Sequence, residues 1–326
     1  MALAIVVHVE QSSYRRSGAR MLITADGHWI GGISGGCLEG DVLKKASYAI
    51  HNQQTAVVRY DTREDDPNQI GVGLGCNGLI DIVIIPIQHE NGQQNPVEVL
   101  SALIEKRVLS FLITNLESGE TLEAKAYLEQ ENALHSYVEE VEKSLDSKAV
   151  NFNGKRYFIE VIKPEIHLLI FGSNYDIIPI LEIAKNIGWR TTVIGNSRKI
   201  SKQIFELSGR VIDRKEPWPE IDNYTVPLIM SHDYGKDLEV LSRLDLSQFR
   251  YVGLLGPNKR KQKMIDELES QNQSIEAKVV YGPMGLDTGA YTPEEIAISI
   301  LAEIRTVYSK RRGGHLRERS KGIYEK

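Results

Sequence analysis

The stretch that most constrains the fold lies just past the middle of the chain. Residues 167–195 read HLLIFGSNYDIIPILEIAKNIGWRTTVIG: an apolar run, a short glycine-bearing turn, a helical pattern and a second apolar run. A strand, a helix and a strand within roughly 30 residues are typical of the opening βαβ unit of a doubly wound parallel sheet. The apolar residues of the helical part recur at the spacing of one buried face; they are Ile177, Ile180, Leu181, Ala184 and Ile187.

Later segments extend this pattern. Strand-like runs follow at residues 227–231 and 251–255, and alternation of strands with helices favours a parallel sheet. A last helix is predicted to begin at Thr292, because Pro293 stands at its first position and Glu295 completes a capping box. Its core-facing residues would be Ile296, Ile300, Leu301 and Ile304. The second half is therefore predicted to be a Rossmann-like domain.

The first half predicts a different, mixed α/β domain. It opens on the apolar run ALAIVVHV, which indicates a buried strand and not a signal peptide. Because a chain seldom opens on a core strand, we expect a short N-terminal element to be missing or shortened. The 326 residues suit two domains, and we place them at residues 1–162 and 163–308. Residues 309–326 form a basic tail that we expect to be flexible.

The bulk composition excludes several classes of protein. A net charge of −5 argues against a nucleic-acid binder. No apolar run approaches the ~20 residues that a membrane-spanning helix needs. The two cysteines, Cys37 and Cys76, are too few for a disulfide scaffold and fit a reducing compartment. We therefore expect a soluble cytoplasmic protein that binds neither nucleic acid nor membrane.

A glycine-rich segment between a predicted strand and a predicted helix is the first candidate site. It reads SGGCLEGD from Ser34, and the adjacent glycines Gly35 and Gly36 let the backbone turn its amide groups toward a ligand. With the helix start, these amides predict an anion site suited to phosphate. Cys37, beside that helix start, is expected to have a lowered pKa. Glu39 completes the candidate set, and the alternative is a structural turn with a buried thiol.

A second glycine-dense loop precedes the strand-like run at residues 79–87. It reads GVGLGCNG and contributes Gly73, Gly75 and Cys76. It lacks both the Walker sequence and the strand–loop–helix context of a dinucleotide site. Because each cysteine ends a glycine loop, we expect Cys37 and Cys76 to face one pocket, where they are candidate metal or sulfur contacts. The alternative is a long glycine loop without a ligand.

Three arginines within six residues form a third candidate. Arg15, Arg16 and Arg20 carry guanidinium groups, which suit phosphate and carboxylate recognition. They would be the counter-charges of a phosphorylated ligand, or else a solvated basic turn.

The phosphate-binding turn of the predicted Rossmann-like domain departs from the usual pattern. Asn174 stands at the second glycine position and Ile177 at the third, where both would obstruct a pyrophosphate. Asn196 stands where a ribose-binding acid is expected. The sequence therefore argues against bound NAD(P), although another nucleotide remains an alternative. The candidate nucleotide contacts are Gly172, Ser173, Asn174 and Asp176.

Taken in their order along the chain, several segments of this sequence resemble the XdhC/CoxI family of molybdenum-cofactor insertion factors. The resemblance covers nearly the whole chain and is weakest in the middle third. The segments that carry it are SSYRRSGARMLI, GGISGGCLEGDV, YDTREDD with GVGLGCNGLIDIVIIP, YVGLLGPNKRK and GLDTGAYTPEEIAISILAEI. The sequence departs from the family's pattern at two points. Its turn reads GSNYD, where the family commonly has a sequence closer to GAGH or GAGD, and it lacks the family's usual helix before the first strand.

The resemblance implies a function in maturation of the molybdenum cofactor, a pterin that bears a phosphate and a dithiolene holding molybdenum. The protein would bind and protect this cofactor, assist its sulfuration by a cysteine desulfurase, and insert it into a molybdenum hydroxylase apoenzyme of the xanthine dehydrogenase type. It would act as a homodimer and without turnover chemistry of its own. The alternative is an NAD(P)-dependent oxidoreductase or a nucleotide-sensing protein that uses the Rossmann-like domain.

Overall fold

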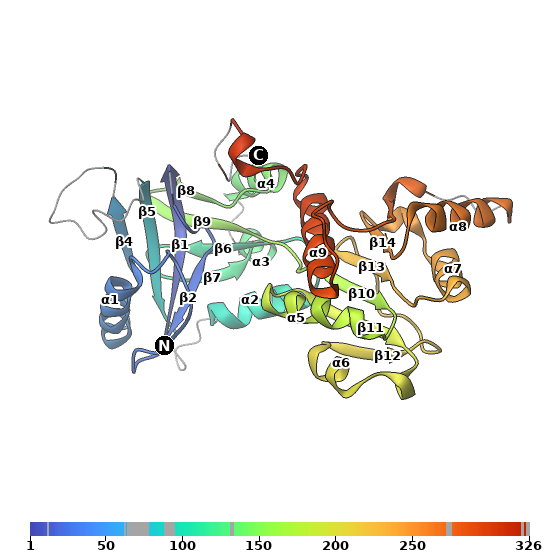
Figure 1. Ribbon diagram of the computed structural model, residues 1–326. Coiled ribbons are helices and arrows are strands. Elements are labelled where there is room, and N and C mark those ends of the chain that lie inside the picture. The colour runs from blue at the N-terminus through green and yellow to red at the C-terminus, as the bar shows by residue number, and fades with distance from the viewer. Residues whose placement is uncertain are drawn as a thin grey trace. The chain divides into compact units, whose positions relative to one another are not determined.

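A computed structural model describes residues 1–11, 13–61, 63, 78–87, 95–130, 134–271, 276–320 and 323. The chain divides into two units, Met1–Pro164 and Glu165–Lys326. Figure 1 shows the helices and strands of each unit. The predicted fold class is confirmed, since unit 1 is mixed α/β and unit 2 contains a parallel sheet.

Unit 1 begins with an antiparallel sheet, called sheet A here, in the order β3-β2-β1-β5-β4. Its strands are β1 (Ala2–Gln11), β2 (Arg20–Ile23), β3 (Trp29–Gly31), β4 (Ala56–Asp61) and β5 (Gly78–Pro86). Successive side chains of a strand point to opposite faces, and β1 shows this clearly. Ala4 and Val6 pack under helix α1 (Glu39–Asn52), whereas Ile5 and Val7 face a second sheet.

That second sheet, sheet B, has the order β7-β6-β9-β8. Its strands are β6 (Ser110–Asn115), β7 (Thr121–Glu123), β8 (Lys148–Phe152) and β9 (Lys155–Ile162). Its helices are α2 (Pro96–Glu105), α3 (Ala124–Gln130) and α4 (His135–Ser144). Phe158 of β9 packs against Ile5 and Val83 of sheet A, whereas Ile159 faces α3 and α4. Unit 1 is therefore layered as α1, sheet A, sheet B, and α3 with α4.

Two ion pairs cross the interface between the sheets of unit 1. Fully buried Asp81 on β5 accepts hydrogen bonds from Arg59 Nε at 2.7 Å and from Arg156 of β9 at 2.9 Å. Arg20 of β2 pairs with Glu160 of β9, which is 4% exposed. A buried carboxylate needs such partners because desolvation of its charge is costly. Both pairs therefore tie sheet A to sheet B.

Unit 2 is a doubly wound domain with a parallel sheet in the order β12-β11-β10-β13-β14-β15. Its strands are β10 (His167–Phe171), β11 (Arg190–Gly195), β12 (Arg210–Asp213), β13 (Thr225–Ile229), β14 (Val252–Leu254) and β15 (Val280–Tyr281). Its helices are α5 (Ile178–Asn186), α6 (Lys202–Leu207), α7 (Tyr234–Arg243), α8 (Asn258–Ser270) and α9 (Pro293–Ser309). Its 3-10 turns are η2 (Tyr175–Ile177), η3 (Ser197–Lys199), η4 (Leu246–Gln248), η5 (Ala277–Val279) and η6 (Leu316–Glu318).

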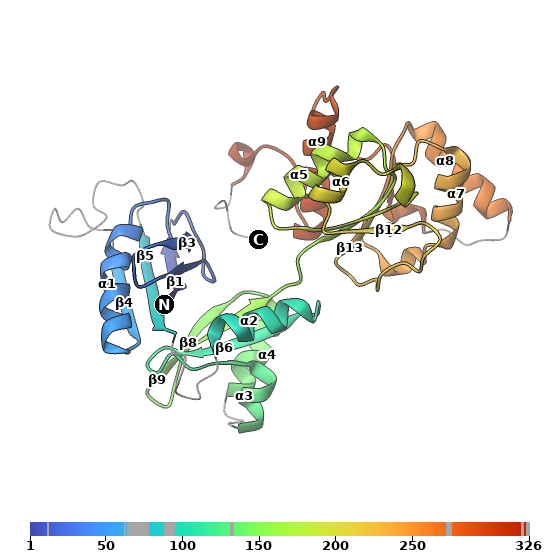
Figure 2. The ribbon, with the colours of Figure 1, turned by 90° about the horizontal axis from the view of Figure 1, so that it is seen from below.

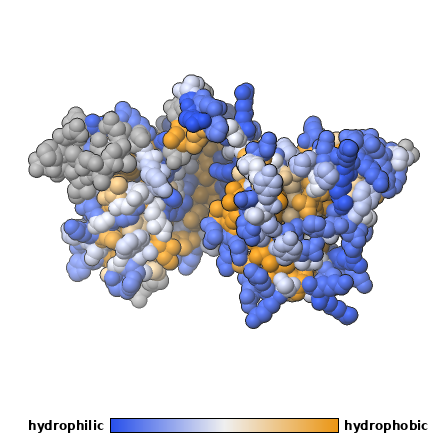
Figure 3. All heavy atoms as spheres, in the orientation of Figure 1, coloured by the Kyte–Doolittle hydropathy of each residue, from blue (hydrophilic) through white to orange (hydrophobic). Residues whose placement is uncertain are grey.

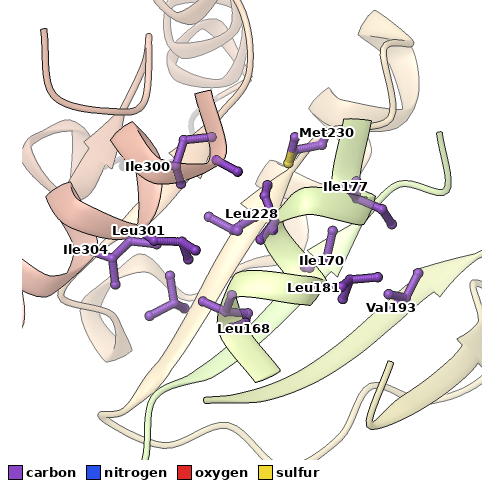
Figure 4. Packing of buried hydrophobic residues seen from close by; sticks show 14 of the residues in the cluster. Leu168, Ile170, Ile177, Leu181, Val193, Leu228, Met230, Ile300, Leu301 and Ile304 are labelled. Carbon is purple, nitrogen blue, oxygen red and sulfur yellow. The ribbon is translucent and has the colours of Figure 1, made fainter. Parts of the chain in front are cut away.

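Helices cover both faces of this sheet. Leu168 and Ile170 point toward α5, α6 and α9, whereas Leu169 and Phe171 point toward α7 and α8. Figure 2 shows the two helical layers, and Figure 4 shows the packing between β10, β13, α5 and α9. Burial of both faces explains why the strands read as continuous apolar runs.

The helix ends show where the sequence pattern succeeds and where it fails. The capping box of α9 is present, with Thr292 and Glu295 in their expected reciprocal hydrogen bonds. The prediction that Ile187 belongs to the buried face of α5, however, is wrong. The helix ends at Asn186, so Ile187 is its C-cap residue and is 49% exposed.

Across the described residues, no helix is both long enough and apolar enough to cross a membrane.

Asp81→Asn should destabilise the protein by about 3–5 kcal/mol at pH 7, because Arg59 and Arg156 lose the carboxylate that they share. Burial raises the pKa of Asp81, but the two arginines outweigh it and hold the pKa below its ordinary value. The stabilisation is therefore present above about pH 4 and is lost as the pH falls through the lowered pKa. Urea unfolding of both proteins at pH 7, 5 and 3 measures this.

The advantage of the native protein over Asp81→Asn should shrink toward pH 3. Exposed Glu142→Gln serves as the control and should change stability by less than about 0.5 kcal/mol. An advantage of equal size at pH 3 and pH 7 would contradict a charge-based role for Asp81.

Candidate functional site

The segment between β3 and α1, residues 32–38, is called the glycine–cysteine loop here. Its amides of Gly36, Cys37 and Leu38 all donate to Oγ of Ser34, at 3.2, 3.1 and 3.1 Å. The Ser34 hydroxyl thus holds the loop that leads into α1, which begins at Glu39 and has Leu38 as its N-cap residue. The sequence pattern predicts that the amides of Gly35, Gly36 and Cys37 hold a ligand phosphate. In the structure, two of them, Gly36 and Cys37, donate to the hydroxyl of their own loop.

Glu39 closes the loop from the other side. Its Oε1 accepts from the amides of Ser34 at 2.8 Å and Ile33 at 3.2 Å, and its Oε2 accepts from the Ser34 hydroxyl. Burial raises the pKa of Glu39, but these hydrogen bonds outweigh it, so the pKa lies below its ordinary value. Glu39 is therefore charged at neutral pH, and its position fixes the loop instead of facing a ligand.

A second polar cluster lies at the first turn of α1. Asp41 accepts a hydrogen bond from the hydroxyl of Tyr60 at 2.6 Å and also pairs with Lys45. Burial raises the pKa of Asp41, but the bonds from Lys45 and Tyr60 lower it below its ordinary value. Burial and the Asp41 hydrogen bond both raise the pKa of Tyr60. A carboxylate at a helix start also complements the helix dipole, so this cluster fixes α1 against β4.

The segment of residues 13–20, called the arginine loop here, lies against the glycine–cysteine loop. A Cβ placed on Gly35 would lie 3.4 Å from Cγ of Tyr14, so the tyrosine ring covers the Gly35 backbone. Tyr14 is nonetheless 67% exposed, and Arg15 and Arg16 next to it are exposed too. The structure therefore brings two predicted sites together: the segment with the exposed arginines Arg15 and Arg16, and the glycine–cysteine loop, which carries Cys37.

Arg20 is in a different place from the other two arginines. Its guanidinium donates to the carbonyl of Gly18 at 2.8 Å and pairs with Glu160 on β9. Its side chain is only 22% exposed. Arg20 thus anchors the base of the arginine loop to sheet B, and anion binding by the three arginines stays a prediction.

Cys37 is partly buried and packs against the core under α1. Gly73, Gly75 and Cys76 lie outside the described residues, so a pocket shared by Cys37 and Cys76 stays a prediction. Within the described parts of the chain, no group of three or more His, Cys, Asp or Glu side chains could hold a metal ion.

In unit 2, the predicted nucleotide contacts lie at the carboxyl end of β10. Gly172 and Ser173 follow the strand, and Asn174 precedes the turn η2. Ile177 points into the core, where it is fully buried (Figure 4), so its bulk does not fill the turn. Asp176 pairs with His232, a residue that the sequence motifs did not indicate. The motifs did not indicate Tyr14 as a contact either, although an aromatic residue next to two consecutive arginines could have suggested it.

The chain belongs to the XdhC/CoxI family. The family described as "XdhC and CoxI family" matches residues 1–61, and the "XdhC Rossmann domain" matches residues 168–304. The first match spans the arginine and glycine–cysteine loops, and the second spans most of unit 2. The resemblance inferred from sequence motifs is therefore confirmed.

Similar proteins extend over nearly the whole chain. A Bacillus subtilis protein, named as a probable subunit of xanthine dehydrogenase, is 28% identical over 93% of this chain and 91% of its own. The Escherichia coli molybdenum cofactor insertion chaperone PaoD is 22% identical over 94% of this chain and 82% of its own. A crystal structure of a Bacillus halodurans protein described as a xanthine dehydrogenase is 29% identical with a TM-score of 0.74, covering 95% and 92% of the two chains.

Ser34→Ala should destabilise the protein by about 1–2 kcal/mol, because three amides and Glu39 lose their shared hydroxyl. Hydrogen exchange at Gly36, Cys37 and Leu38 should accelerate in the same variant. Denaturant unfolding and residue-resolved exchange measure the two effects.

Ser47→Ala is the matched control, because Ser47 is an exposed residue of α1. It should leave stability within about 0.5 kcal/mol and exchange unchanged. Equal effects of the two substitutions would show that the Ser34 hydroxyl does not hold the loop.

Proposed function

We propose that this chain binds the molybdenum cofactor and inserts it into a molybdenum hydroxylase of the xanthine dehydrogenase type. The observation that carries the proposal is the meeting of the arginine and glycine–cysteine loops at Tyr14 and Gly35. It places an exposed ring, two exposed guanidinium groups and a partly buried thiol on adjoining segments. The names of PaoD and of the Bacillus subtilis relative support the choice of substrate and client.

Each group suits one part of this substrate. The ring of Tyr14 offers a flat face for a pterin ring, since aromatic rings favour stacked or edge-on contacts. Arg15 and Arg16 suit the phosphate, to which guanidinium groups bind through paired, charge-assisted hydrogen bonds. The Cys37 sulfur is a soft donor that matches a sulfur-bound metal. The substrate would thus lie across the two loops.

The hydrogen bonds within the two loops favour the exposed arginines as the phosphate contacts. The amides of Gly36 and Cys37 donate to Ser34, and Arg20 pairs with Glu160. The charge for the phosphate is therefore assigned to Arg15 and Arg16. Gly73, Gly75 and Cys76 remain candidate contacts of the same cofactor.

The proposal includes partners as well as substrate. A cysteine desulfurase would supply the sulfur that replaces an oxo ligand of molybdenum, and the chain would act as a homodimer without turnover chemistry. Insertion requires an apoenzyme of the hydroxylase class, which the relatives' names favour. These steps follow from the family resemblance, whereas substrate binding follows from the loops.

Arg15→Ala combined with Arg16→Ala should weaken cofactor binding at least about tenfold, which corresponds to about 1.4 kcal/mol. Cofactor released from a donor molybdenum enzyme is mixed anaerobically with the full chain. The pterin retained on ultrafiltration is then measured by its fluorescence after oxidation. Tyr14→Ala should weaken retention by a similar factor, whereas Tyr14→Phe should keep it, because the ring and not the hydroxyl makes the contact.

Lys143→Ala is the control, since Lys143 is a cation of unit 1 whose side chain is 79% exposed. It should retain pterin as the native protein does. Full retention by the double arginine variant would remove the two arginines from the site.

Cys37→Ala should leave the fold intact and reduce either pterin retention or activation of a client hydroxylase. Thermal unfolding checks the fold, and reconstitution of a molybdenum-free apoenzyme checks transfer. If retention and activation both equal those of the native protein, Cys37 has no part in the function.

A further inference from the structure

Sheet A ends at β3, a strand whose outer edge is exposed. β3 is the last strand in the order β3-β2-β1-β5-β4, so no strand of the described residues pairs with its outer side. Figure 2 shows β3 at the end of the sheet opposite β4. Its two large side chains are both exposed, Trp29 at 51% and Ile30 at 78%. β3 is therefore an open sheet edge that carries apolar side chains.

The register of the β2–β3 hairpin fixes which main-chain groups of β3 face outward. Thr24 donates its amide to the carbonyl of His28, the residue before β3. Hydrogen-bonded and non-hydrogen-bonded pairs alternate along an antiparallel ladder. Trp29 lies opposite Ile23 in the next pair, which is therefore not hydrogen-bonded. The N–H and C=O of Trp29 point away from β2, where they can pair with a further strand.

The two apolar side chains of this edge lie on opposite faces of sheet A. Trp29 is opposite Ile23, which belongs to the core under α1, so its ring is on the α1 face. Ile30 is opposite Leu22, which packs on the face toward sheet B. A strand that pairs with β3 would therefore bring its own side chains against Trp29 on one face and Ile30 on the other.

Other sheet edges of this protein carry charges, which usually protect an edge from pairing. β4, at the opposite end of sheet A, contains Arg59 and Asp61, and β12 in unit 2 contains Arg210 and Asp213. The sequence of β3, Trp-Ile-Gly, has no charged residue. The apolar edge is also unlike the visible surface over α7 and α8, which is mostly hydrophilic (Figure 3). The composition of β3 thus leaves its edge open to a partner.

The size of this edge favours a partner that binds and then leaves. Stable interfaces bury about 800 Å² per partner, far more than a three-residue strand provides. Gly31 also ends the strand, because its φ is +87° and a Cβ there would lie 2.4 Å from the carbonyl oxygen of Arg20. The edge by itself is therefore too small to hold a second copy of this chain in a stable dimer.

A carboxylate at the tip of the hairpin adds a charge preference. The side chain of Asp26 is 69% exposed and accepts a hydrogen bond from the hydroxyl of Thr24. That hydrogen bond lowers the pKa of Asp26 below its ordinary value, so the group is negatively charged at neutral pH. A segment that extends past β3 toward this tip is favoured if it carries a lysine or arginine there.

We propose that β3 binds an extended segment of the client hydroxylase apoenzyme as an added strand. Main-chain hydrogen bonds to Trp29 give the segment its register, and apolar contacts with Trp29 and Ile30 cover both faces. Because β3 leads directly into the glycine–cysteine loop at Gly32, the client lies next to the groups proposed for the cofactor. The inference rests on the proposed function, and a weak, short contact suits a client that must leave with its cofactor.

Binding of a molybdenum-free hydroxylase apoenzyme to the immobilised full chain, followed by biolayer interferometry, tests the proposal. Trp29→Pro removes the outward N–H, and proline is tolerated where that group faces solvent at a sheet edge. It should weaken apoenzyme binding at least about tenfold. Trp29→Thr, which removes the ring but keeps the N–H, should weaken binding less. Asp26→Asn should slow association and reduce its dependence on salt.

Ile30→Lys is a second test that leaves the main chain intact, and it should also weaken apoenzyme binding at least about tenfold. Its matched control is Tyr48→Lys, the same kind of change at a side chain of α1 that is 69% exposed, which should bind as the native chain does. Thermal unfolding confirms that each variant is folded.

The proposal is overturned if the native chain does not bind the apoenzyme, or if both Trp29→Pro and Ile30→Lys bind it as the native chain does. It is also overturned if Ile30→Lys changes the mass of the chain alone in sedimentation, because the edge would then join two copies of this chain. Pterin retention is measured in parallel and should be native in every variant. Loss of retention by the native chain would instead contradict the proposed function.

Discussion

The hydroxyl of Ser34 is the contact on which the candidate cofactor site depends. It accepts from three consecutive amides of the loop before α1 and donates to Glu39, the first residue of that helix. A single small side chain thereby fixes the turn between β3 and α1 and occupies the amides of Gly36 and Cys37. The backbone geometry around Gly36 and Cys37 follows from this closure.

The positive charge of the candidate site comes from a segment held in place by the packing of two sheets. Arg20 pairs with Glu160 across the interface of sheet A and sheet B, so the base of the arginine loop is anchored in the interior of unit 1. Arg15 and Arg16 remain at its exposed tip, and Tyr14 rests on Gly35. Arg20 therefore contributes to the packing of unit 1, whereas Arg15 and Arg16 are the exposed arginines that we propose for phosphate binding. The packing of the unit 1 core therefore also positions the arginine loop of the candidate site.

Much of the fold could be predicted from the sequence, because local patterns determine it. The βαβ unit, the apolar alternation of β1 and the capping box at Thr292 depend on neighbours a few residues apart. Contacts between distant segments could not be predicted. Glu160 lies 140 residues from Arg20, and Asp176 lies 56 residues from His232. Ile187 fitted the helical spacing, but the helix ends one residue earlier, which periodicity alone does not specify.

Unit 1 thus offers two kinds of surface: adjoining loops with a ring, cations and a thiol, and an exposed strand edge that leads into one of these loops. The central claim concerns the first. A crystal structure of the full chain with molybdopterin tests it most directly. The account predicts pterin density against the ring of Tyr14, with its phosphate on Arg15 and Arg16 and its dithiolene toward Cys37. Pterin density at the carboxyl edge of the parallel sheet, with the two loops empty, would contradict it.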